Sequence, residues 1–100
     1  MAELLDGPAV ASALTELDDW SGGPEAITRT AQLPSFPDAI AVVDRVAVVA
    51  ESMDHHPDID IRWRTLTFRC ATHSAGGVTA KDVELARRID EVVRNQGALP

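Results

Sequence analysis

The sequence has little of several residue types, and each shortage excludes a class of protein. It contains one cysteine, Cys70, so no internal disulfide can form and a cytoplasmic protein is expected. Only four side chains are aromatic, so the core must consist mainly of Val, Ile, Leu and Ala. The first ten residues lack a positive region followed by a long apolar run, so no signal peptide is expected.

Positive charge is also scarce, with nine Lys and Arg residues against sixteen Asp and Glu and a net charge of −7. No basic cluster exceeds the pair Arg87–Arg88. Binding to nucleic acid or to an anionic membrane needs a surplus of positive charge, so we expect neither as a partner. The longest apolar run, 39–50, contains Asp44 and Arg45 and is too short to span a bilayer.

The first third of the chain predicts a helix followed by strands. Asp6 can cap a helix with Pro8 in its first turn, and apolar residues follow at helical spacing: Val10, Leu14 and Leu17. The segment Trp-Ser-Gly-Gly-Pro at 20–24 ends this helix as a loop, with Trp20 a candidate for a short strand. Residues 26–33 predict the next strand.

A long helix is predicted from Ser35 to about Asp54. Ser35 and Asp38 have capping-box spacing, and Pro57 forces the helix to stop at or before His55. The apolar residues of this helix cover two faces, which favours burial on two sides, one of them by a contact between copies of the chain. These faces are Ile40, Val43, Ala47 and Ala50, and Val42, Val46, Val49 and Met53.

Two strands and a last helix complete the chain. Apolar residues alternate over 59–63 and again, with opposite parity, over 66–70, which predicts a tight turn or bulge near 63–65. Gly76–Gly77 forms a loop, and Thr79 and Asp82 cap a helix that runs to about Asn95. The order α-β-β-α-β-β-α predicts one α+β domain over residues 1–100, with a four-stranded antiparallel sheet covered by three helices.

The three histidines carry the strongest functional signal. His55 and His56 end the long helix, His73 ends a strand, and Glu51 lies four residues before His55 on the same helix face. Imidazole ionises near neutral pH, so such a cluster suits proton transfer. Three clustered histidines also fit a zinc site, although neighbouring side chains at 55 and 56 point in different directions.

The spacing Glu51-x3-His55-His56-Pro57-x5-Trp63-x9-His73-x8-Asp82 resembles the signature of the pterin-4a-carbinolamine dehydratases. The resemblance implies dehydration of 4a-hydroxytetrahydrobiopterin to the quinonoid dihydropterin, without metal or cofactor. It implies His55, His56 and His73 as catalytic residues. Substrate-binding or supporting roles are implied for Glu51, Asp82, Pro57, Trp20 and Trp63. A homodimer or homotetramer and a functional link to an aromatic amino-acid hydroxylase are also implied.

Other interpretations remain open for several of these residues. Asp82 is explained as a helix cap, Trp63 as a packing residue, and His55 by the favourable dipole at a helix end. Some relatives have binding roles: animal members also serve as a dimerisation cofactor for a homeodomain transcription factor, and some bacterial members are proposed assembly factors for a carbon-fixing enzyme. A protein-binding module on the same fold is therefore the alternative to the enzyme.

Overall fold

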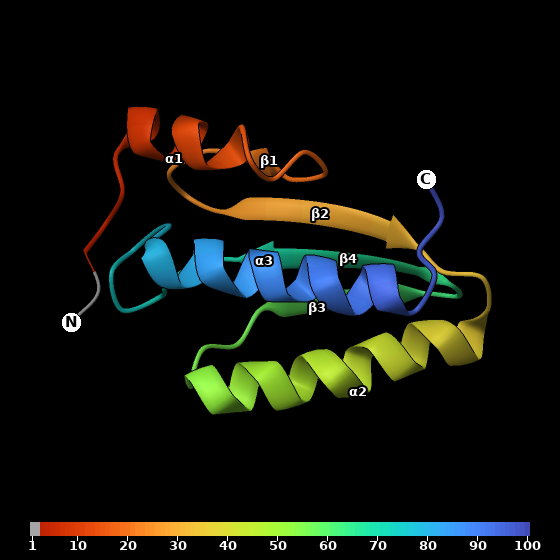
Figure 1. Ribbon diagram of the computed structural model, residues 1–100. Helices are drawn as coiled ribbons and strands as arrows, with labels where there is room; N and C mark the ends of the chain where they lie inside the picture. The colour runs from red at the N-terminus through yellow and green to blue at the C-terminus, as the bar shows by residue number, and fades with distance from the viewer. Residues whose placement is uncertain (1–2) are drawn as a thin grey trace.

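The computed structural model describes residues 3–100, which form a layer of helices packed on a four-stranded antiparallel sheet (Figure 1). The predicted α+β class and the predicted order of elements are confirmed. In chain order the elements are α1 (Gly7–Leu14), β1 (Ser21–Gly22), β2 (Ile27–Gln32), α2 (Phe36–Met53), β3 (Asp58–Arg62), β4 (Thr65–Cys70) and α3 (Ala80–Asn95).

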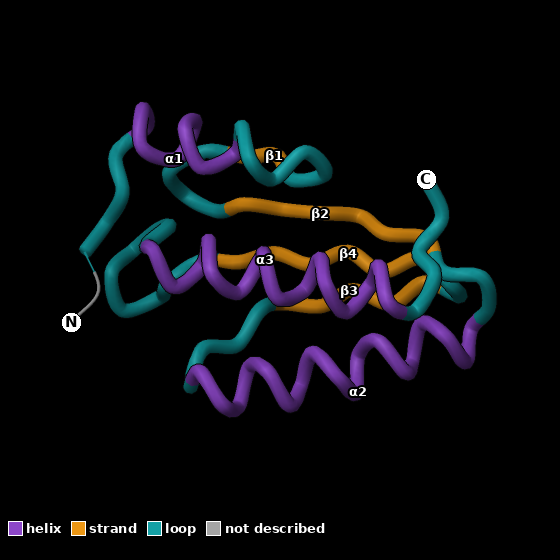
Figure 2. The backbone as a smooth tube through the Cα atoms, viewed as in Figure 1, coloured by secondary structure: helices purple, strands orange, loops and turns teal. Residues whose placement is uncertain are grey.

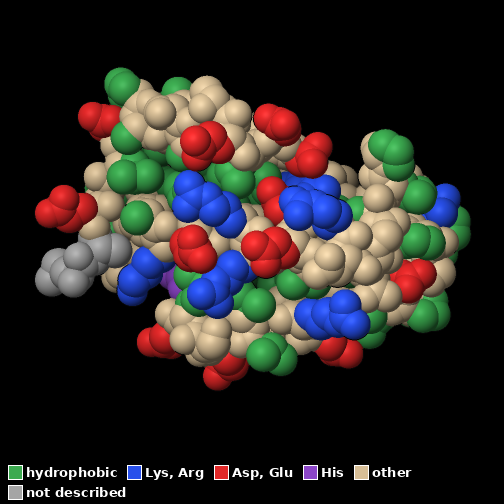
Figure 3. Space-filling model, viewed as in Figure 1, with side chains coloured by type: hydrophobic (Ala, Val, Ile, Leu, Met, Phe, Trp, Pro, Cys, Tyr) green, Lys and Arg blue, Asp and Glu red, His purple; other side chains and the backbone are tan. Residues whose placement is uncertain are grey.

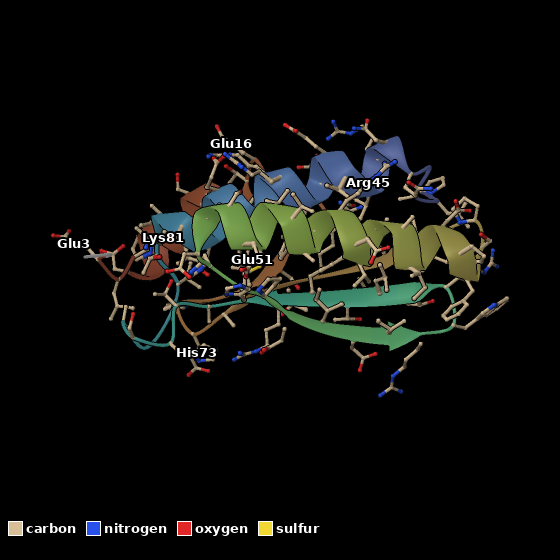
Figure 4. All side chains as sticks on the ribbon, turned by 90° about the horizontal axis from the view of Figure 1, so that it is seen from below. Glu3, Glu16, Arg45, Glu51, His73 and Lys81 are labelled. Carbon is tan, nitrogen blue, oxygen red and sulfur yellow. The ribbon has the colours of Figure 1, made fainter. Side chains whose placement is uncertain are left out.

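The sheet has one apolar face and one polar face. Its strand order is β1-β2-β4-β3, and the register aligns Ala31 with Leu66 and Ile59 with Phe68 on the face that the helices cover. Leu66 and Phe68 have no exposed surface. On the opposite face Thr30 lies beside Thr67, and no helix of the described chain covers this face (Figure 4). The strands therefore alternate as a half-buried sheet requires.

The turn predicted near 63–65 is confirmed. Arg62 pairs with Thr65, which leaves Trp63 and Arg64 as a two-residue hairpin turn between β3 and β4 (Figure 2). Trp63 has a positive φ of 54°, and the Arg64 guanidinium lies 4.7 Å from the centre of its ring. The turn reverses the chain, which explains the change of parity between the two strands.

Helix α2 begins where the sequence predicts, with the Ser35 hydroxyl accepting from the Asp38 amide at 3.2 Å. Its buried residues form one stripe: Ala39, Val42, Val46 and Ala50. The other side is open, because Ala47 is exposed and Val48 is 71% exposed. Within one chain only one side of α2 is therefore buried, and the contact between copies stays a prediction.

Two details near the N-terminus differ from the expectation. Helix α1 ends at Leu14, and single hydrogen-bonded turns carry the chain on to Trp20. The segment predicted as a loop contains β1, which pairs with β2 through Ser21 and Gly22, whereas Trp20 precedes this strand and is buried. Gly22, at φ 133°, makes the pairing possible, because a side chain there would collide with the Ala26 carbonyl.

Cys70 ends β4 in the core, and burial raises the pKa of its thiol from 9.0 to about 12, with Asp82, Asp58 and Asp90 adding to the rise. The unfolded thiol loses its proton above pH 9 while the folded thiol keeps it. The contribution of the protonated Cys70 thiol to the free energy of unfolding is therefore fully present below pH 9. It is lost as the pH rises from 9 towards 12, by about 1.4 kcal/mol per pH unit.

This linkage predicts a measurable difference between the wild type and Cys70→Ala. From pH 8 to pH 10, urea unfolding should show a fall in unfolding free energy about 1.4 kcal/mol larger for the wild type. The comparison is clean because the chain has no tyrosine and a single lysine, Lys81. Equal falls in both proteins would show that Cys70 does not titrate on unfolding.

Candidate active site

Three segments meet at one end of the molecule: the end of α2, the loop after β4 and the start of α3 (Figures 1 and 2). They bring five of the residues singled out in the sequence to this end: Glu51, His55, His56, His73 and Asp82. Figure 4 shows Glu51 below the last turns of α2 and His73 on the loop that rounds the same end of the sheet. The predicted grouping of histidines and carboxylates therefore has a structural basis.

His55 is directed inward by the way α2 ends. Asp54 adopts the left-handed conformation, with φ 49°, and the His55 amide donates to the Ala50 carbonyl at 3.0 Å. This is the Schellman pattern, which reverses the chain at once. His55 is consequently only 8% exposed, and its ring nitrogen Nε2 lies 2.6 Å from Oδ1 of Asp82.

Asp82 holds this imidazole while it also caps α3. Its Oδ2 accepts the Thr79 amide at 2.8 Å, and the Thr79 side chain completes a capping box. The same Oδ2 accepts the Thr72 hydroxyl at 2.8 Å. Asp82 has no exposed surface, so every contact of its carboxylate is with the protein. The cap predicted from the sequence and the contact with histidine thus coexist in one residue.

Thr72 is a member of this group that the sequence pattern did not single out. It has the same parity as Leu66, Phe68 and Cys70, which all point into the core, and it is 5% exposed. A hydroxyl at an inward position needs a buried hydrogen-bond partner, so the alternation itself was the signal.

His56 pairs with the other carboxylate and faces the solvent. Its Nε2 lies 2.5 Å from Oε2 of Glu51, and the two side chains are 57% and 78% exposed. The expectation that Glu51 shares a helix face with His55 is wrong, because α2 ends at Met53 and the left-handed turn rotates the following residues. Pro57, half-buried, comes directly after His56 and restricts its backbone to extended angles.

His73 occupies a short loop that is closed by hydrogen bonds between Thr72 and Gly77, with the Thr72 amide donating to the Gly77 carbonyl at 2.8 Å. Its side chain is exposed. Gly77 is buried against the Pro24 carbonyl, only 2.5 Å from where a β-carbon would lie, and that carbonyl accepts the Val78 amide at 2.8 Å. The loop is therefore anchored on the side away from His73.

The two tryptophans lie elsewhere in the chain. Trp20 is 4% exposed, and its indole N–H donates to Asp90 at 2.8 Å, about 12 Å further along α3 than Asp82. Trp63 is 69% exposed at the hairpin turn, and β3 separates it from His56 by roughly 15 Å. Neither contributes to the group of histidines within one chain.

Asp90 organises a second polar cluster, which the sequence did not reveal. It accepts from both Trp20 and Arg29, the latter at 2.5 Å. Two hollows of about 220 and 370 Å³ lie beside Arg29, near the C-terminal residues, and neither is lined by a histidine. Between residues 3 and 100, no three His, Cys, Asp or Glu side chains gather as metal ligands. Paired hydrogen bonds are thus the organising contacts of the candidate site.

Basic and acidic side chains alternate over the face formed by α1 and α3 (Figure 3). Arg87 lies 3.6 Å from Glu16, and Arg88 lies 3.1 Å from Glu84. This face therefore has no continuous basic surface. In the described part of the chain, no helix combines the length and the apolarity needed to cross a membrane.

Comparison with known proteins identifies the family. The family model described as pterin 4 alpha carbinolamine dehydratase matches residues 3–92. A Nocardia farcinica protein whose name assigns it provisionally to these dehydratases is 59% identical over 92 residues, which cover 92% of this chain and 97% of the relative. A Roseiflexus castenholzii protein with the same name is 50% identical and is covered over its full length, with 93% of this chain. The chain belongs to the pterin-4a-carbinolamine dehydratase family.

Solved structures agree on the fold. A transcriptional coactivator/pterin dehydratase from Brucella melitensis superimposes with a TM-score of 0.85 at 33% identity, over 89% of this chain and 97% of that one. A pterin dehydratase-like protein identified as a RuBisCO assembly factor in the alpha-carboxysome superimposes with a TM-score of 0.61 at 19% identity. The superposition covers 74% of this chain and 86% of that one. The second likeness concerns the fold alone.

Proposed function

We propose that this chain is a hydro-lyase that dehydrates 4a-hydroxytetrahydrobiopterin, or a related 4a-hydroxytetrahydropterin, to the quinonoid dihydropterin. Membership of the dehydratase family supports this proposal. The single structural observation that carries it is the pairing of two adjacent histidines, each through Nε2, with a carboxylate. A carboxylate in this position orients an imidazole and stabilises the imidazolium that forms during proton transfer.

The reaction requires one proton donor and one proton acceptor. The C4a–O bond breaks as the hydroxyl accepts a proton and leaves as water. The N5–H group loses a proton, and its electron pair forms the C4a=N5 double bond. The proton gained and the proton lost balance, so two ring nitrogens of suitable acidity are sufficient for the chemistry.

In this proposal His56 and His73 transfer the protons, because both side chains are open to a ligand from solvent. Glu51 orients His56, and Pro57 holds it in an extended conformation next to β3. His55, fixed by Asp82, binds the pterin or transfers a proton on its other face. An aromatic amino-acid hydroxylase releases the 4a-hydroxypterin in each turnover. Its dehydration would give the quinonoid dihydropterin, which can then be reduced and used again by the hydroxylase.

A non-enzymatic binding role is the second candidate. The open side of α2 presents Ala47 and Val48, and one protein with this fold is an assembly factor. Such a protein would not need its histidines paired with carboxylates. An assay of dehydratase activity separates the two candidates.

The assay generates the 4a-hydroxypterin with an aromatic amino-acid hydroxylase and follows its dehydration at slightly alkaline pH, where the spontaneous reaction is slow. We expect the purified chain to accelerate the absorbance change of dehydration in proportion to its concentration, with no effect of a chelator. No acceleration would leave the binding role as the better candidate. Loss of the acceleration on chelation would instead indicate a metal-dependent reaction.

A further inference from the structure

A buried chain of hydrogen bonds lies behind His55. The Lys81 amide donates to Oγ1 of Thr79 at 3.3 Å, and Oγ1 of Thr79 lies 2.8 Å from Oγ1 of Thr72. The Thr72 hydroxyl lies 2.8 Å from Oδ2 of Asp82, whose Oδ1 contacts His55 at 2.6 Å. Thr72 is 5% exposed, and Thr79 and Asp82 are completely buried, so water does not interrupt this chain.

The direction of every hydrogen bond in this chain follows from the number of protons available. A hydroxyl has one proton, and an ionised carboxylate only accepts. Thr72 must therefore give its proton to Asp82, which leaves its oxygen to accept from the Thr79 hydroxyl. The Thr79 oxygen in turn accepts the amide of Lys81. The carboxylate of Asp82 accepts at both oxygens and has no proton to donate. In its contact with Oδ1, Nε2 of His55 must therefore be the donor, so Nε2 carries the proton.

The consequence for His55 concerns its second ring nitrogen. With the proton on Nε2, a neutral ring has its lone pair on Nδ1. Among residues 3–100, Nδ1 makes no side-chain hydrogen bond, and the buried side-chain nitrogen and oxygen atoms without a partner are Nε of Arg29 and Nε of Arg64. With Nε2 held by Asp82, Nδ1 is the ring nitrogen that remains to accept a hydrogen bond from a ligand.

We propose that Thr72 is a positioning residue that, through Asp82, holds neutral His55 in the Nε2–H tautomer, with Nδ1 as a hydrogen-bond acceptor for the bound pterin. The use of that acceptor in the reaction rests on the proposed function, whereas the tautomer does not. Thr72 anchors Oδ2 together with the Thr79 amide. Without the hydroxyl the carboxylate has one anchor fewer and can rotate, and the Thr79 hydroxyl loses its acceptor.

The first test is nitrogen-15 NMR of the imidazoles in the uniformly labelled protein without ligand. Only three histidines are present, and His55→Asn assigns the signals of His55 by their loss. The wild type should show His55 as a single Nε2–H tautomer at a pH where the ring is neutral. Thr72→Val, which keeps the shape of the side chain, should give a mixture of tautomers, and Thr72→Ser should restore the single tautomer.

Thr67→Val is the matched control, because Thr67 lies on β4, five residues before Thr72, and faces the open side of the sheet, where it contacts Thr30 at 3.1 Å. In this control variant the tautomer of the His55 ring should be the same as in the wild type. An Nδ1–H tautomer in the wild type would overturn the proposal, even if Thr72→Val did not fold. An unchanged tautomer in a folded Thr72→Val would overturn it as well.

The second test is kinetic. We expect Thr72→Val to lower kcat about tenfold with little change in KM, since a hydrogen bond to a charged group contributes roughly one factor of ten or more. Thr72→Ser should recover most of the rate. A kcat equal to that of the wild type would overturn the catalytic part of the proposal. A wild type without any dehydratase activity would refute the proposed function, while the NMR result would still decide the tautomer.

Discussion

Replacing Asp82 by alanine is expected to lower the free energy of unfolding by about 4 kcal/mol, the largest stability effect of any single substitution in the candidate site. The carboxylate is completely buried and accepts from His55, Thr72 and Thr79. Removing it leaves these donors buried without a partner, at a cost of about 1–3 kcal/mol each before the structure relaxes. The first turn of α3 loses its cap at the same time.

Urea unfolding at neutral pH measures this effect. Asp60→Ala is a suitable control, because Asp60 is exposed on β3 and makes only a surface contact with Arg62, so its loss should change the unfolding free energy by about 0.5 kcal/mol or less. A loss below about 1 kcal/mol for Asp82→Ala would mean that water or a rearranged side chain replaces the carboxylate.

The second large effect is on activity. His56→Ala and His73→Ala should each lower kcat by about 100-fold or more, which is the usual contribution of a positioned acid or base. Both side chains are exposed, so neither substitution opens a cavity, and the fold should be retained. Circular dichroism and urea unfolding establish that retention before the kinetic comparison.

Arg45→Ala provides the matched control for these variants, because Arg45 is exposed on α2 away from its C-terminal end. Its kcat should equal that of the wild type. Full activity in both histidine variants would refute the proposed roles and would turn attention to His55. Glu51→Gln should have a smaller effect than His56→Ala, because it removes the orienting charge and leaves the imidazole.

The fold was largely predictable because its signals are local. The caps at Asp6, Ser35 and Thr79 all accept a backbone amide of the first turn. The change of parity between Ile61 and Leu66 located the hairpin turn within the chain. Such signals depend on a few neighbouring residues, so the rest of the structure does not override them. The short strand β1 was expected at Trp20 and lies at Ser21–Gly22 instead, because two residues of glycine-rich sequence have no periodicity that would fix their position.

For the candidate site, the sequence predicted that the histidines and carboxylates lie at one end of the molecule, but it did not predict which carboxylate pairs with which histidine, nor that Trp20 and Trp63 lie elsewhere. The histidines and carboxylates stood out by type and spacing, whereas the partner of each imidazole depends on the left-handed residue at the end of α2 and on the packing of α3. Asp82 lies 27 residues from His55, and no local rule joins them. Asp90, 70 residues from Trp20, shows the same limit.

The reversal at Asp54 also bears on which insertions and deletions this chain can accept. One residue added or removed within the last turns of α2 would rotate the next segment of the chain by about 100°, so His55 and His56 would no longer meet their carboxylates. The turn at Trp63 and Arg64, at the other end of β3, carries no such constraint on the histidines. The distance in sequence from Glu51 to His56 should accordingly stay fixed wherever both contacts are retained.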